Sequence, residues 1–305
     1  MTAKRGKNRV KKAVIAGGTG FIGTFLKEKY ERLGYRVYII SRQSEHIQWA
    51  DEQCMKDALD GAKLVINLAG KSVDCRYTEA NKREIFNSRT ETTESLGRMI
   101  EACSVAPELW VNASTATIYR HAEDRPMTEG GGEVGHGFSV EVAKAWEDSF
   151  FSFQLPKTRQ VALRIAIVLG DGGVMEPYRK LVRYGLGGKQ GNGRQMFSWI
   201  HIEDLYRTIR FMQHRDKLSG VFNASAPNPV TNKEWMKALR RSMNRRTGLP
   251  ASKWMLKTGA AALRTETELI LKSRWVVPER LVREGFRFRY PGVGSALADL
   301  NNRQT

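Results

Sequence analysis

Cysteine is scarce in this chain, which has only Cys54, Cys75 and Cys103 among 305 residues. Their odd number and irregular spacing fit neither a disulfide framework nor a metal site, and favour a reducing, cytoplasmic setting. Long apolar runs are also missing, because no stretch approaches the ~18 residues that a membrane-spanning helix needs. We therefore expect no membrane span and no metal centre.

Acidic residues are in deficit, with 32 Asp and Glu against 50 Lys and Arg and a formal net charge of +18. The excess lies in residues 1–12, which carry six basic residues and no acid, and in residues 231–305, which carry sixteen against six. This distribution fits general solubility, a lobe that attracts an anionic substrate, or a nucleic-acid or membrane-surface role. The run RRSMNRR at 240–246 contains no aromatic residue, which makes a nucleic-acid partner the less favoured interpretation.

Glycine, by contrast, is concentrated in the stretch AVIAGGTGFIG at 13–23. Residues 14–16 have the pattern of a buried strand, and residues 21–33 have apolar side chains at helical spacing. Four glycines lie at the junction of these elements: Gly17, Gly18, Gly20 and Gly23. Between a strand and a helix, this spacing allows a sharp turn and a close backbone approach to a pyrophosphate at the helix N-terminus. The stretch therefore predicts a dinucleotide-binding loop.

The end of the second predicted strand, residues 36–40, indicates which dinucleotide binds. NAD sites usually have Asp or Glu there to hold the ribose 2′-hydroxyl, but no acid occurs from residue 37 to residue 44. Ser41 and Arg42 occupy the position instead, and a guanidinium suits a 2′-phosphate. We therefore favour NADP, with an ordinary exposed arginine as the alternative.

Strands and helices alternate through the next part of the chain. The pattern predicts strands at 63–67, 110–113 and 161–169, and helices at 79–103 and 138–153. This order implies the α/β class, with a Rossmann-type doubly wound parallel sheet that binds ligands at the carboxyl ends of its strands. Arg42, Gly70, Ser114 and Gly170 would lie along that edge.

Three parts of the chain are predicted from composition. Residues 1–12 form a basic tail, and residues 13–230 form an NADP-binding Rossmann domain that includes part of the substrate cleft from about 171–197. Residues 231–305 form a smaller C-terminal α/β substrate lobe.

Several motifs resemble the extended short-chain dehydrogenase/reductase superfamily: GGTGFIG, NLAG, FSWIHIEDL and VFNASAPNPVTNKEW. The match is closer to an atypical "epimerase family" branch of undefined activity, on GKSVDCRYTEANKREIFNSRTETT, on LRIAIVLGDGG and on SRWVVPERLVREGFRFRYPGVGSALADL. The last stretch is similar to that branch's own C-terminal domain. The resemblance covers about residues 13–300.

The resemblance implies a set of cofactor-binding residues: Gly17, Thr19, Gly20, Phe21, Ile22 and Gly23 in the glycine loop, Ser41 and Arg42 at the 2′-phosphate, Leu68, Ala69 and Gly70 at the riboses, and Glu84, Arg89 and Ile167 elsewhere along the cofactor. Arg89 would add positive charge from a helix beside the site. Its alternative is a solvated helix charge.

The catalytic pair of that superfamily, Tyr-x-x-x-Lys, is absent. None of the nine tyrosines has Lys four residues later, and Ser139 and Ala143 occupy the two positions on the predicted helix at 138–153. Lys144 is displaced by one residue, which rotates it ~100° around the helix. Ser114 remains as a catalytic candidate, and Tyr119 is a candidate acid or a packing residue. His201 we interpret as structural.

Taken together, these residues predict an NADP(H)-binding oxidoreductase or epimerase-like protein that acts on an unidentified, anionic small molecule. The missing pair keeps an alternative open, an NADP(H)-binding sensor or scaffold with little turnover. Both a monomer and a homodimer are compatible with the sequence.

Overall fold

A seven-stranded parallel sheet forms the centre of the molecule in the computed structural model, which describes residues 10–252 and 272–303. Most of the predicted tail at 1–12 and residues 253–271 of the predicted lobe lie outside the described residues. The strand order is β10-β6-β5-β4-β1-β2-β3. The strands are β1 (Lys12–Ala16), β2 (Arg36–Ser41), β3 (Ile47–Gln48), β4 (Leu64–Asn67), β5 (Leu109–Thr115), β6 (Arg159–Ile165) and β10 (Gly220–Ala224). This arrangement confirms the predicted Rossmann-type fold.

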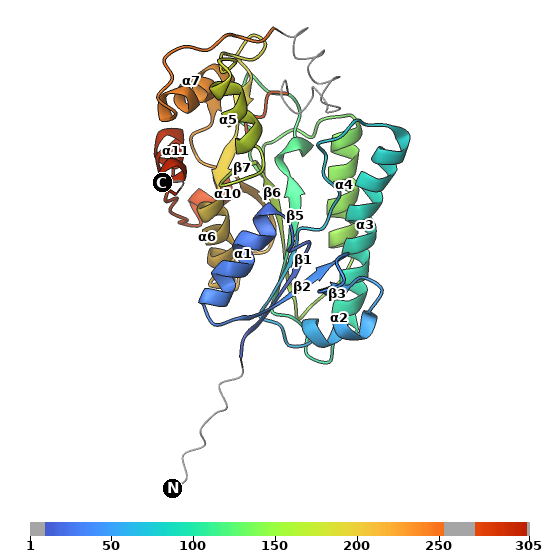
Figure 1. Ribbon diagram of the computed structural model, residues 1–305. Helices are drawn as coiled ribbons and strands as arrows, with labels where there is room; N and C mark the ends of the chain where they lie inside the picture. The colour runs from blue at the N-terminus through green and yellow to red at the C-terminus, as the bar shows by residue number, and fades with distance from the viewer. Residues whose placement is uncertain (1–9, 253–271, 304–305) are drawn as a thin grey trace.

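Helices cover both faces of the sheet (Figure 1) because side chains along a strand alternate between the faces. In β1, Ala13 and Ile15 pack into one core with α1 (Phe21–Arg32) and α6 (Ile202–Gln213). Val14 and Ala16 pack into a second core on the opposite face. That face is covered by α2 (Glu52–Leu59), α3 (Glu79–Glu101) and α4 (Phe138–Phe151). The strand is therefore buried on both sides, as its continuous apolar run predicts.

The single strand predicted at 161–169 is wrong, because the structure has two strands there. β6 ends at Ile165 in the central sheet, and β7 (Ile167–Leu169) pairs instead with β9 (Trp199–His201) in a separate two-stranded sheet. At the division, the Ala166 N–H donates to the Ala224 carbonyl and the Ile167 N–H to the Ser198 carbonyl. Apart from Arg164 the run is apolar on both sides of Ala166, so its hydrophobic pattern does not mark the break.

A third apolar core joins segments from both sides of residue 230. It contains residues of α5 (Met175–Arg183), β8 (Met196–Phe197), α7 (Asn232–Ser242) and α11 (Val293–Asn302). Strand β11 (Val230–Thr231) pairs with β8. The short helix α10 (Glu279–Arg283) packs beside β10 in the central sheet. Phe197 and Trp235 stack in the third core with ring centroids 4.5 Å apart. Within the described residues, no helix is long and apolar enough to cross a membrane.

Candidate functional site

The glycine loop between β1 and α1 has the tight geometry that its sequence predicts. Gly17 has φ +72°, and a Cβ atom there would lie 2.7 Å from the Ala69 amide nitrogen. A Cβ on Gly23 would lie 2.5 Å from the Gly18 Cα, whereas one on Gly20 would meet nothing nearer than 3.7 Å. The loop therefore packs tightly on its inner side and has room on its outer side.

Helix α1 starts at Phe21, directly after this loop, and no side chain caps its N-terminus. Its first backbone N–H groups are therefore available to an anion, and the helix dipole favours negative charge there. The Phe21 ring is held by a second glycine-rich turn, because a Cβ on Gly170 would lie 2.5 Å from its ring. Thr19 is exposed in the loop.

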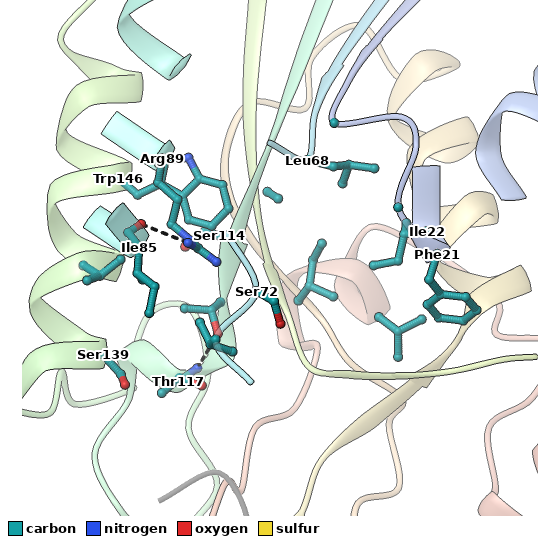
Figure 2. A pocket seen from close by; sticks show the side chains of 18 of the residues that line it. Phe21, Ile22, Leu68, Ser72, Ile85, Arg89, Ser114, Thr117, Ser139 and Trp146 are labelled. Carbon is teal, nitrogen blue, oxygen red and sulfur yellow. Dashed lines mark hydrogen bonds between the residues drawn. The ribbon is translucent and has the colours of Figure 1, made fainter. Parts of the chain in front are cut away.

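A cavity of about 500 Å³ opens between the start of α1 and the facing walls of α3 and α4. Figure 2 shows Phe21, Ile22 and Leu68 on one side, and Arg89, Ser114, Ser139 and Trp146 on the other. The lining comprises Gly17, Gly20, Phe21, Ile22, Gly23, Leu68, Ser72, Val73, Tyr77, Ile85, Arg89, Ala113, Ser114, Thr115, Thr117, Phe138, Ser139, Val142, Trp146, Ile165, Ala166 and Val168. The structure thus brings together eight predicted site residues: Gly17, Gly20, Phe21, Ile22, Gly23, Leu68, Arg89 and Ser114.

Arg89 is the one cation among the residues that line this cavity. Its Nη1 donates to the Ile85 carbonyl at 2.9 Å, and its guanidinium lies 5.2 Å from the Trp146 ring centroid. Burial lowers the pKa of Arg89 to about 10, so the side chain stays charged at neutral pH. In the described part of the chain, no carboxylate forms an ion pair with it. An anionic ligand would supply the missing counter-charge.

Gly70 gives Arg89 the room to take this position. A Cβ atom at Gly70 would lie 3.0 Å from the guanidinium carbon, closer than side chains normally approach. Ala69 similarly backs Gly17, and its N–H donates to the Asn67 side chain at 3.0 Å. These two predicted residues therefore support the cavity from behind rather than lining it.

Ser114 lies near the end of β5, and its hydroxyl donates to Glu147 on α4 at 2.5 Å. The Glu147 carboxylate is held in turn by the Arg164 guanidinium through two contacts of 2.8 and 2.7 Å. The side chains of this ion pair are only 12% and 10% exposed. The Ser114 proton is thus committed to a buried, charged network, and only the oxygen lone pairs of Ser114 remain for a ligand.

Tyr119 is 1% exposed and is not among the residues that line the cavity. Its hydroxyl donates to Asn223 at 2.9 Å and accepts from Arg164 at 2.9 Å. Burial raises the pKa of Tyr119. These contacts are those of a packing residue, which is the alternative that the sequence left open. Ser114 lines the cavity and Tyr119 does not, so the two catalytic candidates do not face the same cavity.

The remaining predicted cofactor residues lie around the cavity rather than in its lining. Ser41 accepts from the Gln43 N–H, and Arg42 is exposed with no side-chain partner in the described ranges 10–252 and 272–303. Ser41 is the last residue of β2 and Arg42 follows it, and the Ile40 carbonyl of the same strand accepts from the Gly17 N–H at 2.9 Å. Glu84 pairs with Lys71 at 2.5 Å on the outside of α3. Ile167 lies on β7, between the lining residues Ala166 and Val168.

Two functional features were missed from the sequence. Neither Glu147 nor Arg164 was predicted from the sequence, although Arg164 interrupts the apolar run VALRIAIVL. A charge inside a strand that is otherwise buried requires a partner, so that interruption was the signal for the Glu147 pair. His201 is buried and accepts from the Glu203 N–H, which agrees with a structural role.

Comparison with known proteins agrees with this geometry. Residues 13–135 match the model of the NAD dependent epimerase/dehydratase family, and residues 251–300 match a domain of unknown function, DUF1731. Epimerase family protein YfhF of Bacillus subtilis is 33% identical over 299 residues, which cover 94% of this chain and 96% of the relative. This chain belongs to the epimerase family.

A human member of the epimerase family, SDR39U1, is 30% identical over 95% of this chain and 99% of its own length. Its isoform 2 has been crystallised with NADPH, and that structure superimposes with a TM-score of 0.87, at 29% identity, over 95% of this chain and 99% of that one. A nucleoside-diphosphate sugar epimerase from Corynebacterium glutamicum gives 0.76 at 27% identity, over 95% of this chain and 58% of that one. The similarity therefore extends through both the sheet and the C-terminal segment.

Proposed function

We propose that this protein is an NADP(H)-binding oxidoreductase or epimerase-like enzyme that acts on an unidentified anionic small molecule. One observation carries the proposal: the glycine loop and the unneutralised Arg89 guanidinium line the same cavity. The NADPH in the human relative supports the choice of cofactor. The excess of Lys and Arg in residues 231–305 supports an anionic substrate.

The residues present fit a phosphorylated dinucleotide. Gly20 has no Cβ atom, and the N-terminus of α1 is uncapped, so a pyrophosphate has both space and free backbone N–H groups there. The charge of Arg89 would balance the charge of the pyrophosphate. Arg42 is free to pair with a 2′-phosphate beside the loop. When bound, NADP supplies the hydride exchange of the reaction, while the protein orients the reacting groups.

We expect Ser114 to hold the reacting oxygen of the substrate. Because its proton is committed to Glu147, Ser114 presents lone pairs to the cavity and accepts a hydrogen bond. That favours a substrate hydroxyl, ready for oxidation, over a carbonyl at this position. We assign the removal of the hydroxyl proton to water in the cavity rather than to Tyr119, whose hydroxyl is already engaged on both sides.

The binding test compares two arginines of α3. Calorimetry should show that Arg89→Gln weakens NADPH binding about tenfold to a hundredfold, since a charged contact of this kind contributes ~1.5–3 kcal/mol. Arg83→Gln, an exposed position on the same helix, should leave the affinity unchanged. Equal affinities for the two variants would refute the role of Arg89.

A second candidate function is an NADP(H)-binding sensor or scaffold with little turnover. For either function we propose a cytoplasmic location, because the three cysteines are free thiols. The sensor or scaffold is favoured by one observation: Ser139 and Ala143 occupy the positions of the usual Tyr and Lys, and Lys144 is exposed. Absorbance at 340 nm with a broad panel of ketones and nucleotide sugars separates the two functions. Tight NADPH binding without any oxidation of NADPH would favour the sensor.

A further inference from the structure

A strongly basic hollow of about 570 Å³ lies at the end of α7 and shares no lining residue with the cofactor cavity. It is lined by Lys237, Arg240, Arg241, Asn244, Arg245 and Arg246, which we call the α7 basic surface. Among the described residues, none of its five cations forms an ion pair with a carboxylate. The nearest acid on the helix, Glu234, is at the opposite end, where it completes a capping box with Thr231.

Local structure gathers these charges onto one side. Trp235, Met236 and Leu239 face the third core, so the basic positions fall on the outer face of α7. At the helix end the Asn244 N–H donates to the Arg241 carbonyl and the Arg245 N–H to the Arg240 carbonyl. Asn244 has φ +56°, and this left-handed turn reverses the chain. The helix dipole favours cations in the last turn, but it gives no reason for the arginines beyond the reversal.

Exposed apolar side chains adjoin this surface. Tyr184 and Leu249, at 79% and 66%, are the two most exposed large hydrophobic residues in the parts of the chain that the structure describes. The Leu249 N–H donates to the Gly185 carbonyl at 2.8 Å, which brings the two together, and Leu186 is 42% exposed in the same turn. The Arg240 Nη1 donates to the Gly187 carbonyl at 2.5 Å, which joins this turn to α7. In Figure 1, α5 and α7 lie together at one end of the molecule.

We propose that the α7 basic surface and its apolar rim, Tyr184, Leu186 and Leu249, bind the surface of an anionic lipid bilayer. Clustered Lys and Arg are attracted to acidic headgroups, and exposed apolar side chains beside them enter the headgroup and acyl boundary. Nucleic acid fits less well, because exposed leucines gain nothing from base stacking and the rim offers a single aromatic ring. The interaction is peripheral and leaves the cofactor cavity free.

Sedimentation of the full chain with vesicles tests this inference. We expect binding to vesicles of phosphatidylcholine mixed with phosphatidylglycerol, weakening with salt, and little binding to phosphatidylcholine alone. The triple variant Arg241→Gln/Arg245→Gln/Arg246→Gln should bind at least about tenfold more weakly. The double variant Tyr184→Ser/Leu249→Ser should lose about tenfold as well, because it removes the apolar contribution without changing charge.

Matched variants keep the test specific. The control is a triple variant that removes three positive charges from exposed positions elsewhere, Arg36→Gln/Arg215→Gln/Lys217→Gln. All the variants, including this control, keep the basic tail. The control should retain vesicle binding, and every variant should keep its unfolding midpoint and its NADPH affinity. An equal loss in this control would overturn the proposal in favour of net charge alone. It would also be overturned by absence of binding to anionic vesicles, or by tight RNA binding that is insensitive to Tyr184→Ser/Leu249→Ser.

Discussion

The buried pair of Arg164 and Glu147 makes a strong prediction about stability. Substituting Arg164→Leu would leave the Glu147 carboxylate about 90% covered, with only the Ser114 hydroxyl as a hydrogen-bond donor. Removing one partner of a buried ion pair costs about 3–5 kcal/mol, because the remaining charge is neither solvated nor paired. The same substitution also removes a donor to Tyr119, so we expect a value within this range rather than below it.

Urea unfolding followed by tryptophan fluorescence measures the effect. With a slope near 3 kcal/mol/M, typical of a large domain, a loss of about 3–5 kcal/mol lowers the midpoint by about 1–1.7 M. The control is Lys180→Leu, which breaks the exposed pair with Glu176, where both side chains are at least 60% exposed, and should cost no more than about 1 kcal/mol.

A cost of less than about 1 kcal/mol for Arg164→Leu, or a cost no greater than that of Lys180→Leu, would refute this prediction. Such a result would mean that water reaches Glu147 and that its charge needs no partner. The Ser114 hydroxyl would then not be held in one orientation, and the preference for a substrate hydroxyl would lose its structural basis.

Three further predictions concern the cofactor loop and acid stability. Arg42→Asp should weaken NADPH binding about a hundredfold in calorimetry while leaving NADH binding almost unchanged, since only NADPH carries the 2′-phosphate; equal losses for both cofactors would contradict the assignment. Gly17→Ala should abolish NADPH binding and destabilise the fold by more than about 2 kcal/mol in urea unfolding, because its Cβ would meet backbone at 2.7 Å. The control is Gly34→Ala, because Gly34 also has a positive φ (+77°) but an added Cβ there would meet no other atom. It should cost only about 1 kcal/mol, the cost of placing alanine in the left-handed conformation. Burial lowers the pKa of His201 to about 4, below its ordinary ~6.5, so the folded state holds the neutral ring. The contribution of the neutral His201 ring to the free energy of unfolding is complete above pH ~6.5 and falls by up to about 3 kcal/mol as the pH drops toward 4. Urea unfolding of His201→Asn should lack this pH dependence.

Local signals made the first half of the fold predictable. The apolar runs at β1, β2 and β4 specify buried parallel strands whose carboxyl ends meet at one edge. The glycine loop is equally local, because Gly17 and Gly23 have close backbone neighbours that only this spacing allows. The division of the predicted strand at Ala166 depends on two distant partners, Ala224 and Ser198, which no local pattern contains.

The candidate site was predictable in part. The charge of Arg89 beside the cofactor wall came from the resemblance, but its lack of a counter-ion required the fold, since the sequence cannot show which carboxylates are out of reach. The position of Tyr119 shows the same limit. The sequence left its role open between a candidate acid and a packing residue. The fold decides, because the phenol is buried against Asn223 after a short 3₁₀ turn at Ala116–Ile118.

The division between β6 and β7 at Ala166 has a consequence for any ligand in the cavity. Ile165 belongs to the central sheet, whereas Val168 belongs to the small sheet formed with β9, and both line the same floor. A ligand resting there touches strands of two different sheets within four consecutive residues. A small displacement of one sheet against the other would change the contacts of the ligand even if no residue facing it were replaced.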